Sequence, residues 1–147
     1  MMDQKRQRTL SIVKPDGVGQ RLVGEVVRRF EQAGLRILGL KMLQLERADA
    51  EGFYAVHRGK PFFDSLCDFM SSGPAVVVAL EGEHAIIRLR DLMGSTDPAK
   101  AAEGTIRKAY GTSIERNIVH GSDSEASAAF EIPYFFSALE LIGEGGR

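Results

Sequence analysis

The sequence has a single cysteine, Cys67, among its 147 residues. One cysteine excludes a disulfide within the chain and a zinc site built from several cysteines. Single thiols are typical of reducing compartments, and residues Met1–Arg8 are polar, without the apolar stretch of a secretory signal. We therefore expect a cytoplasmic protein. Cys67 lies in the apolar helical run Phe62–Met70, so we expect it to be buried.

Long apolar runs and an excess of either charge are also missing. No run approaches the roughly 18 apolar residues of a membrane span, so we expect no membrane partner. The formal net charge is -1, from 19 basic and 20 acidic residues. A balanced charge provides no field that would make nucleic acid the main partner. Positive charge needed for function must come from a local cluster.

The common nucleotide-binding motifs are absent as well. Gly17-Val18-Gly19 begins a dinucleotide fingerprint, but Leu22 stands where the third glycine is needed. Gly59-Lys60 is followed by Pro61 instead of serine or threonine, so there is no P-loop. The chain also has no HExxH pair and no serine nucleophile elbow. Phosphate, if it is bound, must be held by scattered side chains.

The chain has the composition of a soluble globular protein, with 44% hydrophobic and 27% charged residues. Its length predicts one domain over residues 1–147, with flexible ends at 1–8 and 143–147. Apolar periodicity and turn residues predict strands at 9–13, 35–45, 75–80 and 117–119, and helices at 24–33, 48–56, 62–71, 83–93 and 123–132.

The other segments read as turns or loops: Pro15-Asp16-Gly17 is a turn sequence, and residues 97–104 form a long loop near Pro98. Residues 75–80 are continuously apolar, which predicts a central strand covered on both faces. The order of the elements predicts an α/β fold, a ferredoxin-like sandwich. In it a four-stranded antiparallel sheet is covered by helices, with added helices and the long loop.

His120 is the histidine best placed for chemistry. It ends a predicted strand and precedes Gly121, which leaves the ring approachable. Ser122 and Glu125 have the spacing of a capping box that starts a helix, and a helix start favours phosphate nearby. A neutral imidazole can act as a nucleophile. The alternative, a strand-end histidine beside a capped helix, is equally consistent with these local features. For His57 and His84 we favour structural or solvated roles.

Four arginines flank loops or helix ends, where guanidinium groups could hold phosphate oxygens: Arg88, Arg90, Arg107 and Arg116, with Thr96 in the intervening loop. Phosphoryl transfer depends mainly on positioning and charge neutralisation. Any one of these arginines is more simply read as a solvated surface residue, but the set together with His120 favours phosphate chemistry.

Several motifs together resemble the nucleoside diphosphate kinase family. The segment Asn117–Ser124 is similar to the family signature. The other segments follow the family order: Lys14–Gly17, Gly52–Tyr54, Arg58–Phe63, Ser72–Pro74, Leu92–Pro98 and Gly104–Arg107. The resemblance extends from about Arg8 to Phe136 and is to the short bacterial form.

The resemblance implies a ping-pong reaction. ATP would donate its γ-phosphoryl group to the histidine, and a nucleoside diphosphate would then accept it in the same site. Mg²⁺ would arrive on the nucleotide phosphates without a protein metal site. A base held by stacking, without hydrogen bonds to its edge, implies broad base specificity.

The resemblance also implies a role for individual residues. His120 matches the phosphorylated histidine, Glu131 the carboxylate that orients it, and Ser122 the residue linked to Glu131. Tyr54 matches a residue close to the histidine. The nucleotide ligands are implied to be Lys14 and Asn117 for ribose and phosphates, Arg90, Thr96 and Arg107 for phosphates, and Phe62 with Ile114 around the base.

The sequence departs from the family pattern at Glu125-Ala126, at Phe130 and at Lys108-Ala109-Tyr110. None of these is a catalytic position, so the departures concern packing and subunit contacts. The family resemblance implies a homo-oligomer, for which a tetramer is favoured and a hexamer is the alternative.

Three other functions remain open. The first is a regulatory nucleotide-binding module on the same fold, against which the presence of both His120 and Glu131 argues. The second is nucleic-acid binding on the sheet, for which the charge and the aromatic pattern give little support. The third is a phosphotransferase with a different acceptor, such as a protein histidine.

Overall fold

The computed structural model describes residues 5–143. The strands are β1 (Arg6–Val13), β2 (Arg36–Gln44), β3 (Pro74–Glu83) and β4 (Val119–Gly121). The α-helices are α1 (Pro15–Gly19), α2 (Val23–Gln32), α3 (Arg47–Phe53), α4 (Phe63–Met70), α5 (Ala85–Met93), α6 (Ile106–Tyr110) and α7 (Glu125–Phe135). Short 3-10 turns are η1 (Ala55–His57), η2 (Pro98–Lys100) and η3 (Ala138–Glu140).

The four strands form one antiparallel sheet in the order β2-β3-β1-β4. This confirms the predicted ferredoxin-like α/β fold. β3 and β1 are the inner strands, and the continuous apolar run at 75–80 predicted this position for β3. β4 pairs with β1 in a register that places His120 opposite Ile12, so the histidine is anchored to an inner strand.

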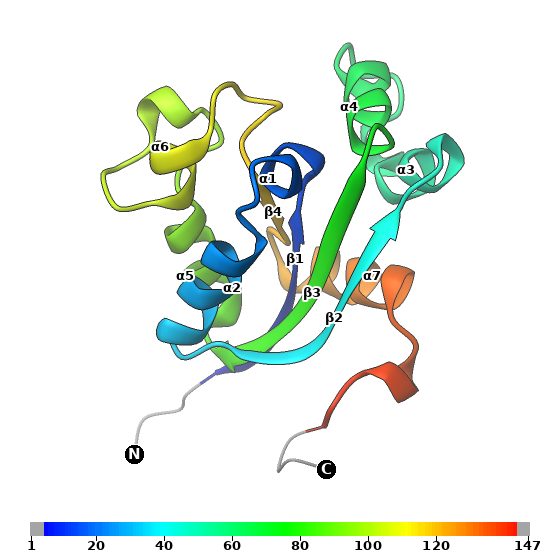
Figure 1. Ribbon diagram of the computed structural model, residues 1–147. Helices are drawn as coiled ribbons and strands as arrows, with labels where there is room; N and C mark the ends of the chain where they lie inside the picture. The colour runs from blue at the N-terminus through cyan, green and yellow to red at the C-terminus, as the bar shows by residue number, and fades with distance from the viewer. Residues whose placement is uncertain (1–4, 144–147) are drawn as a thin grey trace.

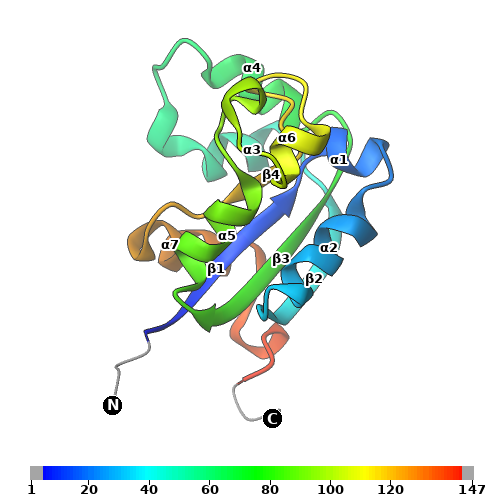
Figure 2. The same ribbon diagram turned by 90° about the vertical axis from the view of Figure 1, so that its left-hand side faces the viewer.

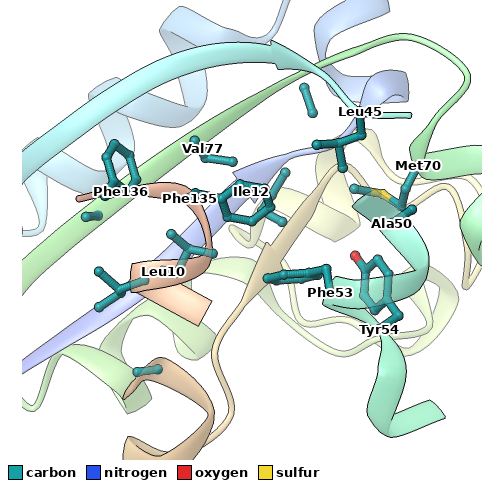
Figure 3. Close-up of a cluster of buried hydrophobic side chains, with 14 of the residues drawn as sticks. Leu10, Ile12, Leu45, Ala50, Phe53, Tyr54, Met70, Val77, Phe135 and Phe136 are labelled. Carbon is teal, nitrogen blue, oxygen red and sulfur yellow. The ribbon is translucent and has the colours of Figure 1, made fainter. Parts of the chain in front are cut away.

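Helices cover both faces of the sheet, and the strand side chains alternate between two apolar clusters. α2 and α5 lie on one face, which Figure 2 shows from the front. α3, α4 and α7 cover the other face (Figure 1). The cluster on that second face joins Leu10 and Ile12 of β1 to Phe53 of α3 and Phe135 of α7 (Figure 3). This packing brings α7 and the α3–α4 hairpin to the same side as His120.

Outside the segment that carries His120, three local features differ from the prediction. Residues 6–8 belong to β1 and pair with β3, whereas we expected them to be flexible; residues 1–4 and 144–147 lie outside the described part. The turn at 15–17 begins the short helix α1, with Pro15 in its first turn, where the missing N–H costs nothing. Helix α6 was not predicted; Thr105 caps it by accepting a hydrogen bond from Lys108 N–H.

No helix in the described residues combines the length and apolar character that crossing a bilayer requires.

Candidate active site

The strand that carries His120 begins after an unusual backbone turn. Ile118 is buried and has φ +77°, a conformation rare for a β-branched residue. Its N–H donates to Asp16 Oδ2 at 3.1 Å and its carbonyl accepts from Lys14 N–H at 2.8 Å, so α1 holds the turn. Because of this turn, β4 covers 119–121 instead of the predicted 117–119, and His120 lies in the middle of the strand.

The helix after His120 begins two residues later than predicted. Its N-cap is Ser124, which forms a capping box with Ser127; the predicted pair Ser122 and Glu125 does not cap it. Ser122 is fully buried, where its Oγ accepts from Leu10 N–H at 3.2 Å and donates to Glu131 at 2.8 Å. Ser122 therefore connects β1 to the carboxylate of α7.

Glu131 holds the histidine ring through the same oxygen. His120 Nε2 lies 2.8 Å from Glu131 Oε1, and since a carboxylate accepts hydrogen bonds, Nε2 carries the proton. The other ring nitrogen, Nδ1, then has its lone pair free. The predicted trio of His120, Glu131 and Ser122 is brought together by the fold.

Aromatic rings fix the histidine from the α3 side. The Phe53 ring meets His120 edge-on at 5.4 Å between centroids, and Tyr54 does so at 6.3 Å. Burial, with a smaller contribution from Glu131, raises the pKa of Tyr54, so its phenol stays neutral. Gly121 is needed for packing more than for access, because a Cβ there would lie 2.8 Å from Met93 of α5.

Two cavities meet at His120. The larger, about 770 Å³, is lined by Arg90, Asp123 and Phe130 among others. The smaller, about 370 Å³, lies between α4 and residues 111–117. Both are also lined by Tyr54, Thr96, Arg107 and His120. A molecule that fills both cavities passes beside His120.

Positive charge gathers at the shared part of the cavities. Arg107 is buried and donates to the carbonyls of Gly94 and Val119, while its Nε is buried with no partner among the described residues. Burial, together with the nearby Arg90, lowers the pKa of Arg107 to about 10. An anion beside these guanidinium groups would offset the free-energy cost of burying positive charge.

The other two arginines of the predicted cluster lie elsewhere. Arg88 donates to the carbonyls of Glu83 and Ala33, and the guanidinium of Arg116 lies 4.7 Å from the centre of the Phe69 ring. Neither lines the two cavities.

Lys14 and Asn117 are joined at the floor of the smaller cavity. Lys14 is only 6% exposed, and its Nζ donates to Asn117 Oδ1 at 2.8 Å and to the Glu115 carbonyl at 3.0 Å. Asn117 in turn donates to the Thr96 carbonyl at 2.9 Å. Burial lowers the pKa of Lys14 to about 8, although Asp16 opposes the shift.

Two apolar side chains line the same cavity while remaining open to solvent: Phe62 is 46% exposed and Ile114 is 61% exposed. The neighbouring Phe63 is buried in the core, so the two adjacent phenylalanines lie in different environments. Exposed apolar surface at a cavity is suited to a flat aromatic ligand.

Two residues that line the larger cavity were not predicted as site residues: His57, for which we favoured a structural or solvated role, and Asp123, which the sequence analysis did not consider. Nδ1 of His57 is buried without a partner among the described residues, and burial lowers the pKa of the ring. A hydrogen bond with Ser127, and the nearby Arg90, lower the pKa of Asp123. The aromatic contact of His57 with Phe62, at 5.2 Å, depends on the α3–α4 hairpin and has no local sequence signal.

The fold and the site together define a class, that of ferredoxin-like α/β enzymes that transfer phosphoryl groups. The family model for nucleoside diphosphate kinase matches residues 7–141. Nucleoside diphosphate kinases from two bacteria align over 137 residues, which are 93% of this chain and 99% of each relative. The one from Desulfosudis oleivorans is 64% identical and the one from Nitratidesulfovibrio vulgaris 59%.

Solved structures indicate the same family. The Aquifex aeolicus nucleoside diphosphate kinase superposes with a TM-score of 0.92 at 45% identity, covering 94% of this chain and all of that one. A halophilic enzyme from Halobacterium salinarum in complex with CDP gives 0.91 at 42% identity, covering 95% and 93%. The chain belongs to the nucleoside diphosphate kinase family. It transfers phosphoryl groups from nucleoside triphosphates to nucleoside diphosphates.

Proposed function

We propose that Nδ1 of His120 is the atom that carries the phosphoryl group. The observation that supports this most directly is the hydrogen bond that commits Nε2 to Glu131. In the first half-reaction the Nδ1 lone pair forms a bond to the γ-phosphorus, and the bond from that phosphorus to the β,γ-bridging oxygen breaks. The nucleoside diphosphate leaves with the bridging oxygen, and Glu131 stabilises the positive charge on the ring.

The second half-reaction reverses these bonds. A terminal phosphate oxygen of an incoming nucleoside diphosphate attacks the phosphorus, and Nδ1 leaves. Because donor and acceptor use the same site in turn, the cycle is ping-pong. Tyr54 packs beside the ring and limits its movement.

The two cavities divide the nucleotide between them. Arg90, Arg107 and Thr96 would bind the phosphates, and Lys14 with Asn117 would bind the ribose hydroxyls and a phosphate oxygen. Phe62 and Ile114 would enclose the base by stacking, without reading its edge, so purines and pyrimidines would both bind. We call the space between Phe62 and Ile114 the base slot.

Mg²⁺ fits this site as an ion carried by the nucleotide. The carboxylates that line the larger cavity are Asp123 and Glu131, and Glu131 already bonds His120 and Ser122. Asp123 is thus the carboxylate left to contact the ion, directly or through its water. When bound, Mg²⁺ would neutralise phosphate charge.

The protein would act in the cytoplasm as a homo-oligomer, with a tetramer favoured over a hexamer. Support for self-association comes from β2, whose outer edge has no strand partner among residues 5–143 and which exposes Leu40 and Met42.

The test is the mass of the intact protein after incubation with Mg-ATP alone, followed by addition of GDP, CDP or dTDP. We expect an acid-labile phosphoryl adduct that maps to His120 and disappears with each diphosphate. Nucleotide binding without an adduct would contradict the proposal. An adduct that diphosphates cannot remove would point to a different acceptor.

The proposed role of Lys14 predicts a pH dependence. The protonated amine should bind phosphate, so the half-saturating diphosphate concentration should be constant below pH 8 and rise above it, by about 10-fold at full deprotonation. The pKa of Lys14 is lower in the folded than in the unfolded chain. The free energy of unfolding therefore rises through this group between pH 8 and 10.5, so weaker binding there cannot reflect unfolding caused by it.

Titration of the discharge reaction from pH 6.5 to 9.5 measures this effect. Lys14→Met should bind more weakly and lose the inflection. The exposed Lys100 provides the control, because Lys100→Met should retain the inflection. An unchanged profile in Lys14→Met would exclude Lys14 as its origin.

A further inference from the structure

The two walls of the base slot come from segments that share no sheet pairing. Phe62 precedes α4, whereas Ile114 lies in residues 111–117, which contain no helix or strand. This loop is folded on itself by hydrogen bonds from Thr112 and Ser113 N–H to the Arg116 carbonyl. These internal bonds do not set the distance between the loop and α4. That distance depends on contacts between the two segments.

A side-chain hydrogen bond crosses from one wall to the other. Ser65 Oγ donates to Glu115 Oε2 at 2.8 Å. Ser65 lies three residues after Phe62, in the first turn of α4, so the two residues lie on the same side of the helix start. Glu115 directly follows Ile114. The bond therefore joins the two segments within one helical turn of each apolar wall.

Two further interactions hold Glu115 in place, one at its backbone and one at its carboxylate. Its backbone carbonyl accepts from Lys14 Nζ at 3.0 Å, so the residue is connected to the floor of the cavity and to its opposite wall. Its carboxylate lies at the N-terminal turn of α4, where the helix dipole favours negative charge. A second contact also joins the loop to α4: the guanidinium of Arg116 lies over the ring of Phe69, farther along the helix.

We propose that Ser65 and Glu115 are positioning residues that set the width of the base slot before nucleotide binds. A stacked base needs two apolar surfaces about 7 Å apart, which is two van der Waals contacts. If the walls were free, this spacing would have to be ordered during binding, at a cost in affinity. The inference rests on the proposed base slot. The bond plays no part in the chemistry at His120.

The experiment separates binding from chemistry by following a single half-reaction. The phosphorylated enzyme is discharged by increasing ADP or CDP, which gives a half-saturating concentration and a maximal rate. Ser65→Ala should raise the half-saturating concentration about 3- to 10-fold for both nucleotides, the loss expected for one ordinary hydrogen bond. The maximal rate should not change. Phosphorylation of the enzyme by phosphoramidate, a donor without a base, should also be unaffected.

Two variants provide the rescue and the control. Glu115→Gln retains an oxygen that can accept from Ser65 but loses the negative charge at the start of α4, so its half-saturating concentration should lie between those of the unmodified protein and Ser65→Ala. Glu115→Ala should match Ser65→Ala. Ser71→Ala removes a hydroxyl of the same region whose hydrogen bonds, among residues 5–143, go to the carbonyls of Cys67 and Asp68 in its own segment. This variant should have no effect.

Phe62→Ala distinguishes failure of the inference from failure of the base slot. If Phe62→Ala weakens binding and Ser65→Ala does not, the slot stands and the positioning role is overturned. If Phe62→Ala also has no effect, the base slot itself is wrong and the inference falls with it. A Ser65→Ala variant that slows phosphoramidate and nucleotide reactions equally would indicate general damage and would also overturn the proposal.

Discussion

Replacement of His120 by alanine is expected to remove phosphoryl transfer while nucleotide binding persists. Without Nδ1 no covalent intermediate can form, so the rate should fall on the order of 10⁶-fold, by analogy with loss of the nucleophile in a serine protease. The proposed base slot and the arginines proposed to bind phosphate do not depend on the ring for their positions. ADP binding, measured by calorimetry, should therefore be retained.

The chain contains a suitable control histidine. His84 is exposed at the start of α5 and does not line either cavity. Its φ of +49° makes asparagine the better replacement, because asparagine tolerates this conformation. His84→Asn should retain full activity. Substantial phosphoryl transfer by His120→Ala would refute a histidine intermediate at this position.

Loss of the Glu131 carboxylate should slow transfer without abolishing it. Glu131→Ala leaves Nδ1 in place but frees the ring to rotate and to change tautomer. We expect a decrease on the order of 10- to 100-fold, similar to loss of a carboxylate that orients a metal-binding histidine. The rate of Glu131→Gln should lie between those of the unmodified protein and Glu131→Ala, since an amide oxygen can accept from Nε2 but carries no charge.

The rate of adduct formation from Mg-ATP measures this directly, because it isolates the first half-reaction. Glu125, in the first turn of the same helix, is exposed and pairs with Lys5, so Glu125→Ala serves as the control. Thermal unfolding of each variant shows whether α7 still packs. An unchanged rate in Glu131→Ala would mean that the carboxylate does not orient the ring.

Most of the fold could be predicted because its signals are local. The apolar run at 75–80 and the amphipathic helices α2 and α5 carry their periodicity in short windows. The start of α7 was missed because two serines, Ser122 and Ser124, could each cap a helix there. Ser122 is taken up by Glu131 and by the N–H of Leu10, contacts across the fold that no window of sequence contains. Ser124 is left to cap the helix.

The same limit applies to the site. Motif resemblance predicted the residues at the histidine and at the cavities, and the fold brings them together. The grouping of arginines near loops and helix ends, which does not depend on the resemblance, also suggested Arg88 and Arg116 as phosphate ligands. Tertiary packing directs both side chains elsewhere. The low pKa of Lys14 follows from burial, and no pattern of neighbouring residues shows that a lysine after a strand will be covered.

The strained turn at Ile118 has a consequence for turnover. A left-handed conformation at a β-branched residue costs on the order of 1–3 kcal/mol, which the surrounding structure must compensate during folding. Since Asp16 and Lys14 hold the turn in the protein without nucleotide, this cost is met once per folded molecule and not once per catalytic cycle. A ping-pong enzyme presents one nucleophile to two different nucleotides in alternation. A preset backbone lets it exchange them without rebuilding the site between half-reactions.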